Sequence, residues 1–503
     1  MEYRNPVLPG FHPDPSICQG EDRYYLVTSS FEYFPGIPLF ESHDLVNWRP
    51  IGHCITRETQ MVFTDQLPNA LGIYAPTIRC IAGRYYVICT NVGTTEHGPG
   101  NFFVWAEDPH GEWSDPIWLD LPGIDPSLFQ DQSGQVWYCG ADQGIYLCAI
   151  ELSDGSHGPR LDIWSGTGGA DPEGPHIYFK DDWYYLMIAE GGTGYGHMVV
   201  MARSREITGP YEACPDNPLL TNRSLPLGIQ GIGHADLLQD ENDNWWAVCL
   251  GIRPLPEFPK RHLLGRETSL VPVDWTGEWP TMGAAGAVLP VMAGPLPGDA
   301  VGETAASEQA SFRDDFKGDK LALSWNTLFR PQPEQILTTE KGLALRLAAV
   351  SQVDEELWLG RRLQHPRFAA EAVFDGSEAA ETVYGISLFL NPTHRYDLCI
   401  QQKAGGDQLR GDFRLGPFAK EQDFSVKVGS VNGLRISGDE RVAVFEVQDE
   451  QGGWQKLTEV AIHYLATETS GIFTGPYIGL FARKEKASGG GTVYCRQFLY
   501  QGL

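Results

Sequence analysis

Three carboxylic acids, Asp14, Asp125 and Glu173, stand directly before a proline or a Gly-Pro pair. Proline restricts its own backbone and that of the residue before it, so these side chains leave the chain at rigid points. A single Asp-Pro-Ser segment would by itself predict a turn. Two carboxyl groups that flank a glycosidic bond can hydrolyse it, one protonating the leaving oxygen and the other activating water or attacking carbon. A third carboxylate nearby would raise the pKa of the acid, because like charges oppose a second ionisation.

Each acid lies at or next to the start of a phrase that occurs five times in the first 250 residues. An aliphatic residue follows each start two or three positions on, and paired aromatics follow about ten residues later. The copies start at Asp14, Ala75, Asp125, Gly174 and His234, which lie 61, 50, 49 and 60 residues apart. This period suits one four-stranded blade of a radial array. We therefore expect each start to lie at the mouth of an innermost strand, where distant acids meet.

The composition predicts two all-β domains. Residues 1–295 alternate short aromatic strands with Gly, Pro and Asp turns and are expected to form a five-bladed β-propeller. Residues 296–310 continue an Ala-, Gly- and Pro-rich stretch and are expected to be a linker. Residues 311–503 alternate apolar and polar residues in seven or more strands with no helix, which is typical of a β-sandwich.

The net charge limits the classes of partner that the protein is expected to bind. The 503 residues include 65 Asp and Glu against 37 Lys and Arg, a formal charge of −28. Such a surface repels nucleic acid and anionic membranes but accepts a neutral sugar. The ten cysteines show no metal-ligand spacing. The first residues contain no apolar signal core, and no apolar stretch reaches 18 residues, so we expect a cytoplasmic protein, or a secreted one if a signal was removed.

Several ordered motifs resemble glycoside hydrolase family 43, in particular its β-xylosidase/α-L-arabinofuranosidase group with a C-terminal sandwich. They are NPVLPGFHPDPSI, SSFEYFPGIPLFESHDLVNW, GIYAPTI, GIDPSLF, EGPHIY, AEGGTGYGH and GRETSL. The resemblance implies a five-bladed propeller followed by a concanavalin-like β-sandwich, and one-step hydrolysis with inversion. It also implies that Asp14 is the general base, that Glu173 is the general acid, and that Asp125 tunes and orients the acid. Inversion needs room for water, so we expect roughly 6.5–9.5 Å between the carboxyl groups of Asp14 and Glu173.

Five further residues are candidates for substrate binding. Arg266 resembles the family arginine that bonds sugar hydroxyls, with a structural salt bridge as the alternative. Phe31 and Tyr74 are expected to wall the sugar ring, with core packing as the alternative; the family more often has Trp at the place of Tyr74. The resemblance places His234 at the central channel, with a structural histidine equally open. It places Phe473 on a sandwich loop that covers the pocket and enforces exo action, with a sandwich core position as the alternative.

The function that these expectations favour is release of xylose from the non-reducing end of β-1,4-xylo-oligosaccharides. The alternatives are an α-L-arabinofuranosidase or bifunctional enzyme and, from another class, a non-catalytic sugar-binding propeller. The expected partners are xylo- or arabinoxylo-oligosaccharides, and relatives often form homo-oligomers. No cofactor is required by the chemistry, and a structural Ca²⁺ beside His234 is an alternative that the resemblance leaves open.

Overall fold

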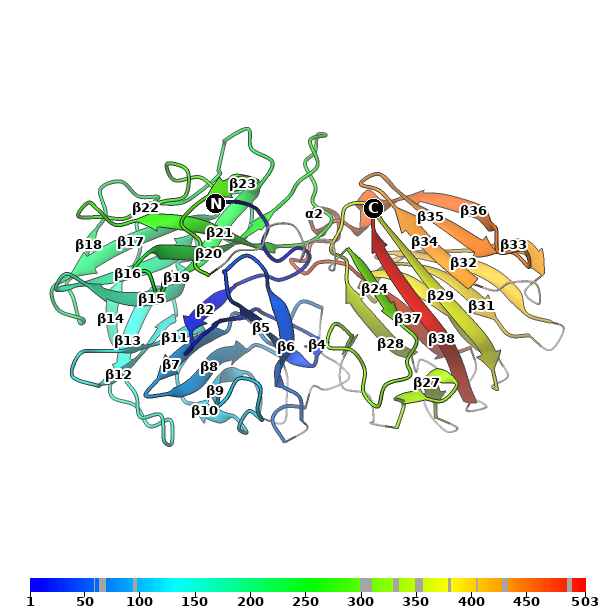
Figure 1. Ribbon diagram of the computed structural model, residues 1–503, viewed down its shortest axis with the longest axis horizontal. Coiled ribbons are helices and arrows are strands. Elements are labelled where there is room, and N and C mark those ends of the chain that lie inside the picture. Colours follow the sequence, from blue (N-terminus) through cyan, green and yellow to red (C-terminus); the bar gives the residue numbers. More distant parts are fainter. Residues whose placement is uncertain are drawn as a thin grey trace. The chain divides into compact units, whose positions relative to one another are not determined.

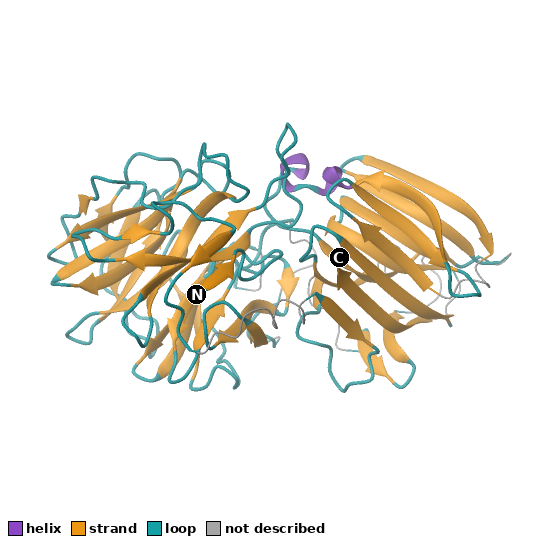
Figure 2. Cartoon of the chain, turned by 45° about the horizontal axis from the view of Figure 1, so that its top comes forward, coloured by secondary structure: helices purple, strands orange, loops and turns teal. Residues whose placement is uncertain are grey.

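The structure is a computed structural model of the chain. It describes residues 1–57, 59–62, 69–93, 97–298, 310–328, 334–348, 356–378, 381–403, 406–427, 433–485 and 491–503. The chain divides into two compact units, which are Met1–Pro254 with Arg266–Gly302, and Leu255–Gly265 with Glu303–Leu503. Strands account for nearly all the regular structure of the described residues (Figure 2).

In the first unit, each of the five repeats folds into a four-stranded antiparallel sheet (Figure 1). From the first strand to the last, the sheets are β2-β3-β5-β6 (Ser16–Gln19, Tyr24–Val27, Gly36–Ser42, Arg49–Ile55), β7-β8-β9-β10 (Thr77–Ile81, Arg84–Asn91, Gly100–Ala106, Ile117–Leu119), β11-β12-β13-β14 (Ile124–Gln130, Val136–Ala141, Ile145–Ala149, Leu161–Trp164), β15-β16-β17-β18 (Glu173–Lys180, Trp183–Glu190, Met198–Ser204, Glu212–Ala213) and β19-β20-β21-β22 (Gln230–Gln239, Trp245–Ile252, Glu267–Asp274, Thr281–Met282). The two-residue strand β4 (Tyr33–Phe34) lies between β3 and β5 in the chain.

The first strands of the five sheets form a closed ring. Strand β2 contacts β7 and β19, β7 contacts β11, β11 contacts β15, and β15 contacts β19. This ring makes them the innermost strands of a five-bladed propeller, which confirms the predicted fold of this unit. Blades are covered on both faces by their neighbours, so their middle strands are buried almost throughout, as in β8.

The N-terminal segment ties the first blade to the fifth. Strand β1 (Glu2–Arg4) pairs with β23 (Val291–Ala293). The Asn5 side chain then exchanges two hydrogen bonds with the backbone of Leu270, each 2.9 Å long. These two bonds provide partners for the buried side-chain amide of Asn5. They also join the N-terminal segment to β21 of the fifth blade, so both ends of the first unit help to close the propeller.

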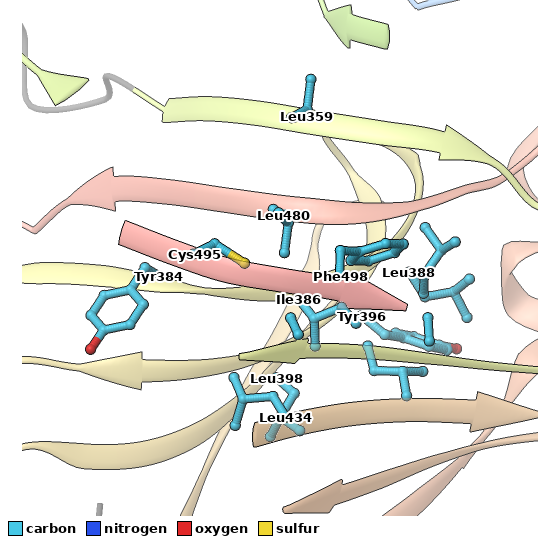
Figure 3. Packing of buried hydrophobic residues seen from close by; sticks show 14 of the residues in the cluster. Leu359, Tyr384, Ile386, Leu388, Tyr396, Leu398, Leu434, Leu480, Cys495 and Phe498 are labelled. Atoms are coloured by element: carbon cyan, nitrogen blue, oxygen red, sulfur yellow. The ribbon is translucent and has the colours of Figure 1, made fainter. Parts of the chain in front are cut away.

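The second unit is a two-sheet β-sandwich, again as predicted. One sheet has the order β26-β27-β38-β29-β34-β35-β36, with β24 also on β38, and the other contains β33-β32-β31-β30-β37-β28-β25. Their bounds are β24 Ser311–Asp314, β25 Asn326–Leu328, β26 Ile336–Thr339, β27 Gly342–Leu347, β28 Glu356–Arg362, β29 Phe368–Ser377, β30 Thr382–Asn391, β31 His394–Gln401, β32 Gln408–Leu415, β33 Phe418–Lys427, β34 Gly433–Gly438, β35 Val442–Gln448, β36 Trp454–Ala461, β37 Tyr477–Lys484 and β38 Gly491–Gly502. The inner faces bury residues such as Ile386, Leu398 and Phe498 (Figure 3).

Two details of this unit differ from the sequence expectation. Residues Leu255–Gly265 belong to it although they lie within the propeller sequence, because Leu263 and Leu264 enter the sandwich core and His262 bonds Glu468 at 2.7 Å. A short helical stretch, η2 (Ile462–Leu465) and α2 (Thr467–Ser470), occurs where no helix was predicted. Of the predicted linker 296–310, residues 299–309 lie outside the described part of the chain.

Candidate active site

Four of the five repeat starts share an unusual backbone conformation. Asp14, Asp125 and His234 are non-glycine residues with positive φ, at 55°, 54° and 47°. Gly174, at the same place in the fourth repeat, has φ 59°. Left-handed backbone is costly for residues with a Cβ atom, and its recurrence at four of the five repeat starts, all except Ala75, marks a shared, strained turn in these blades. Strain of this kind concentrates at functional sites.

Glu173 therefore stands one residue before the position that Asp14 and Asp125 occupy in their blades. It is the first residue of β15 and pairs with Ala189 of β16. The equivalent position itself is Gly174, where a Cβ atom would lie 3.1 Å from the His234 ring, closer than an ordinary van der Waals contact. The fourth blade thus supplies its acid from the preceding residue.

Asp14 is held by cationic and hydroxyl donors. Its side chain is 6% exposed, and Arg266 Nη1 donates to its Oδ1 at 2.7 Å. The hydroxyl of Ser29 donates to Oδ2, and the same Arg266 Nη1 also reaches Thr193 Oγ1 at 3.0 Å. A buried carboxylate is tolerated when it is paired and hydrogen-bonded, so these groups fix Asp14 in place and compensate its charge.

Asp125 is buried beside the other acids, and its pKa reflects this. The pKa of Asp125 is raised to about 7, mainly by burial; the charge of His234 opposes the rise, and the charges of Glu173 and Asp14 add to it. The Gly174 amide also donates to Asp125 Oδ2, at 3.1 Å, which favours the ionised form. The structure therefore brings Asp14, Asp125 and Glu173 within electrostatic reach of one another.

Glu173 is the most accessible of the three carboxyl groups. Its side chain is 19% exposed, and its Oε1 lies 3.5 Å from Nε2 of the fully buried His197. The loop that leads into β15 is anchored by buried Glu190, which accepts hydrogen bonds from the Thr167 and Gly169 amides. The backbone before Glu173 is thus held by hydrogen bonds, while the Glu173 carboxyl group remains partly accessible to solvent.

Aromatic residues line the same region. The Phe31 and Tyr74 rings are 5.3 Å apart, and the Arg266 guanidinium lies 5.6 Å from the Phe31 ring centre. Burial raises the pKa of Tyr74, the Arg266 charge lowers it, and the charges of Asp125, Asp14 and Glu32 raise it. Both predicted wall residues therefore lie close to the carboxyl groups, as does the predicted Arg266.

Comparison with known sequences decides the family. The description "Glycosyl hydrolases family 43" matches residues 3–280, and "Beta xylosidase C-terminal Concanavalin A-like domain" matches residues 313–501. The chain belongs to glycosyl hydrolase family 43. Members of this family hydrolyse glycosides with inversion, so the predicted enzyme class is confirmed.

Relatives narrow the activity. A non-reducing end α-L-arabinofuranosidase of Bacteroides ovatus is 38% identical over 95% of this chain and 91% of its own length. A xylosidase/arabinosidase of Butyrivibrio fibrisolvens is 34% identical over 95% of both chains. A solved structure of xylan β-1,4-xylosidase from Bacillus halodurans has a TM-score of 0.89 at 29% identity, with 99% of each chain covered. This family 43 member is thus an exo-glycosidase of the β-xylosidase or α-L-arabinofuranosidase kind.

A second set of polar residues lies two positions further along each inner strand of this family 43 propeller. All of them are buried: Ser16, Thr77, Ser127, His176 and Asp236. Asp236 is the centre of the set, because Arg79 donates to both of its oxygens at 2.7 and 2.8 Å and Ser16 Oγ donates at 2.6 Å. The hydroxyl of Tyr178 adds a bond of 2.7 Å. This axial network joins strands from four blades.

Burial and the contacts of the axial network also shift the pKa values of Asp236 and His176. Burial alone would raise the pKa of Asp236, but the Arg79 charge and the hydrogen bonds from Arg79 and Ser16 outweigh it and hold that pKa well below its ordinary value. Burial lowers the pKa of His176 to about 3, although Asp236 opposes the change. The axial network therefore contains an Arg–Asp ion pair and a neutral histidine, and sequence spacing alone gave no sign of it.

The structure also shows the surroundings of His234 and Phe473, the two remaining predicted residues. His234 packs against Gly174 and lies close enough to Asp125 to influence its charge. Within the described part of the chain, no group of three or more His, Cys, Asp or Glu residues could hold a metal ion, and the alternative of a structural Ca²⁺ beside His234 stays a prediction. Phe473 lies in the second unit, between α2 and β37, and is partly buried. Its predicted contact with substrate stays a prediction.

No described helix is long and apolar enough to cross a membrane.

Sequence reasoning did not single out Ser29, Thr193 or His197, all of which contact the predicted acids or Arg266. Ser29 and His197 lie within motifs that carried the family resemblance, SSFEYF and AEGGTGYGH. A signal was therefore present, but only the fold shows which residue of each motif faces a carboxyl group.

Proposed function

We propose that this enzyme releases xylose from the non-reducing end of β-1,4-xylo-oligosaccharides, with Asp14 as general base, Glu173 as general acid and Asp125 as the residue that tunes the acid. The observation that supports these roles is the difference between three neighbouring carboxyl groups. Asp14 is paired with a guanidinium, Asp125 is buried with a raised pKa, and Glu173 is the most exposed. Carboxyl groups with divergent environments are the usual basis of acid and base assignment.

The reaction follows from these roles. Asp14 takes a proton from a water molecule as the water oxygen attacks the anomeric carbon. The bond from that carbon to the leaving oxygen breaks, and Glu173 transfers its proton to the leaving oxygen. Asp14 then holds a proton and Glu173 is ionised, and exchange with solvent restores both. We expect roughly 6.5–9.5 Å between the two carboxyl groups, the separation that accommodates the water.

Asp125 acts on the acid in two ways. Its Oδ2 bonds the amide of Gly174, the next residue after Glu173, and so steadies the backbone that carries the acid. Its negative charge, when present, opposes ionisation of Glu173 and so favours the proton-bearing form. Phe31 and Tyr74 offer apolar faces to the C–H groups of the sugar ring, and Arg266 offers donors for its hydroxyls.

The acid assignment is tested with Glu173→Ala on two substrates. Xylobiose needs a proton on its leaving oxygen, whereas 2,4-dinitrophenyl β-D-xyloside does not. We expect the variant to lose about 10²–10⁴-fold in kcat/KM on xylobiose and far less on the aryl glycoside. Wild-type hydrolysis of xylobiose by the variant would contradict the assignment. Proton NMR of wild-type turnover should show α-xylose as the first product, since the reaction inverts a β bond.

The relative from Bacteroides ovatus favours a second candidate, removal of terminal α-L-arabinofuranosyl groups. We expect the same carboxyl groups to act on both pentoses and the xyloside to be preferred. The measurement is kcat/KM for 4-nitrophenyl β-D-xylopyranoside and 4-nitrophenyl α-L-arabinofuranoside under one set of conditions. A higher value for the arabinofuranoside would make arabinofuranosidase the main activity without changing the assigned residues.

A further inference from the structure

His197 has an unusual environment for a histidine inside a propeller. The side chain is 0% exposed, and its Nε2 lies 3.5 Å from Oε1 of Glu173. Neither ring nitrogen makes a hydrogen bond with any residue in the described part of the chain. A buried polar group without a partner is costly, so such a group in a native fold calls for an explanation. The group facing Nε2 is the acid of the reaction.

Packing and backbone hydrogen bonds hold the His197 ring in place, with its Nε2 atom facing Glu173. A Cβ atom on Gly233 would lie 2.4 Å from ring atoms Cε1 and Nδ1, so the imidazole packs directly on the Gly233 backbone. The His197 amide donates to the Gly194 carbonyl at 3.1 Å, and the Thr221 hydroxyl donates to the His197 carbonyl at 2.9 Å. The backbone on both sides of the ring is thus anchored.

We propose that His197 is a positioning residue for the general acid: its Nε2–H donates to Oε1 of Glu173 when substrate binds, which leaves Oε2 to carry the proton. A small rotation of the glutamate shortens 3.5 Å to an ordinary bond of about 2.9 Å, as catalytic contacts do on going from the free to the bound enzyme. His197 keeps its own proton throughout, because the transferred proton comes from Glu173. After transfer, the same N–H stabilises the carboxylate that forms.

Full burial separates this role from that of a second acid or base. With no exposed surface, His197 exchanges no proton with water directly and reaches the substrate only through Glu173. The inference therefore rests on the proposed role of Glu173 as the acid. It predicts that the loss of His197 affects only reactions that need the acid.

The test compares His197→Phe and His197→Gln with the wild-type enzyme. Phenylalanine keeps a flat ring for packing on Gly233 but has no donor, whereas glutamine keeps an N–H donor. We expect His197→Phe to lose about 10–100-fold in kcat/KM on xylobiose, part of the effect of a general acid, and less than about threefold on 2,4-dinitrophenyl β-D-xyloside. His197→Gln should recover part of the loss on xylobiose. If the phenylalanine variant does not fold, the glutamine variant and His197→Asn, which differ in donor reach, give the same comparison.

A double variant distinguishes action through the acid from general damage. If His197 works through Glu173, then Glu173→Gln combined with His197→Phe should hydrolyse xylobiose no more slowly than Glu173→Gln alone. Equal losses on both substrates, or additive losses in the double variant, would overturn the proposal. A Glu173→Gln enzyme that loses equally on both substrates would instead overturn the acid assignment. His262→Phe is the matched control, because His262 is a buried histidine bonded to a carboxylate, Glu468, outside the propeller; it should leave the ratio of the two substrates unchanged.

Discussion

Gly174 occupies in the fourth blade the position that Asp14 occupies in the first, and the two residues share left-handed backbone with φ of 59° and 55°. The shared turn shows that the blades repeat a backbone conformation and vary the side chain at its head. In the fourth blade the carboxyl group has moved one residue back, to Glu173. The Asp14 and Glu173 side chains therefore leave the chain one residue apart on equivalent turns.

Gly174→Ala should weaken both the fold and catalysis. Left-handed backbone costs alanine about 1–2 kcal/mol, and the new Cβ atom would press on His234 at 3.1 Å. The Gly174 amide that bonds Asp125 would shift with it, so we expect kcat/KM to fall at least about tenfold. Gly134→Ala is the matched control, since φ is 89° there and nothing lies within 4 Å of the place its methyl group would take. Equal kcat/KM for the two variants would contradict the expectation.

Asp125→Asn should change how stability depends on pH. The pKa of Asp125 is raised from 3.8 to about 7, so the folded state holds this proton more tightly than the unfolded state. The resulting stabilisation is fully present below about pH 4 and is lost as pH rises through 7. Asparagine does not titrate, so the stability of wild type minus that of the variant should fall over this range, by at most about 4 kcal/mol at about 1.4 kcal/mol per pKa unit.

Urea unfolding of both proteins at pH 5, 6, 7 and 8 measures this difference. Buried Glu32, whose pKa burial also raises to about 7, is present in both proteins, so its contribution cancels. A difference that stays constant from pH 5 to 8 would show that Asp125 titrates normally.

The repeat made the propeller predictable from the sequence. Paired aromatics such as Tyr85 and Tyr86 mark the second strand of a blade, and the residue at the start of each copy marks its first strand. The same reasoning identified the three acids. It could not foresee that Arg79 and Asp236, which lie 157 residues apart, form an ion pair, because no local pattern records a contact across blades.

Residues Leu255–Gly265 show another limit of sequence reasoning. Their composition resembles that of the propeller loops around them, yet Leu263 and Leu264 pack in the sandwich core. A boundary placed by composition assumes that a domain is continuous in sequence. His197 was missed for a related reason: one histidine in a glycine-rich stretch carries no periodicity, and its importance arises only from the glutamate facing it.

Chelation should leave the enzyme unaffected. Two carboxyl groups and a water molecule are sufficient for the proposed hydrolysis, and the described residues present no set of three metal-binding side chains. After exhaustive dialysis against EDTA, kcat/KM and Tm should equal those of the untreated enzyme. A loss that Ca²⁺ restores would instead indicate a bound cation, and His234→Ala would then tell whether His234 lies beside it.

Removing one partner of the axial ion pair should destabilise the propeller strongly. Asp236 is 0% exposed and Arg79, itself 18% exposed, reaches it with two bonds, so Asp236→Leu leaves a largely buried cation without its partner. Breaking a buried pair costs about 3–5 kcal/mol, whereas replacing both members by apolar residues costs less. We therefore expect Asp236→Leu to lower the free energy of unfolding more than the double variant with Arg79→Met.

The exposed pair of Arg84 and Glu107, at 3.4 Å, is the control, and Glu107→Gln should cost less than about 1 kcal/mol. Acid should have a related effect on the wild type. Because the pKa of Asp236 is depressed, its contribution is present above its unfolded value of 3.8 and disappears as pH falls towards the folded value. Urea unfolding from pH 6 to pH 3 should show this loss in the wild type and not in Asp236→Leu. Parallel curves for the two proteins would mean that Asp236 contributes no charge-dependent stability.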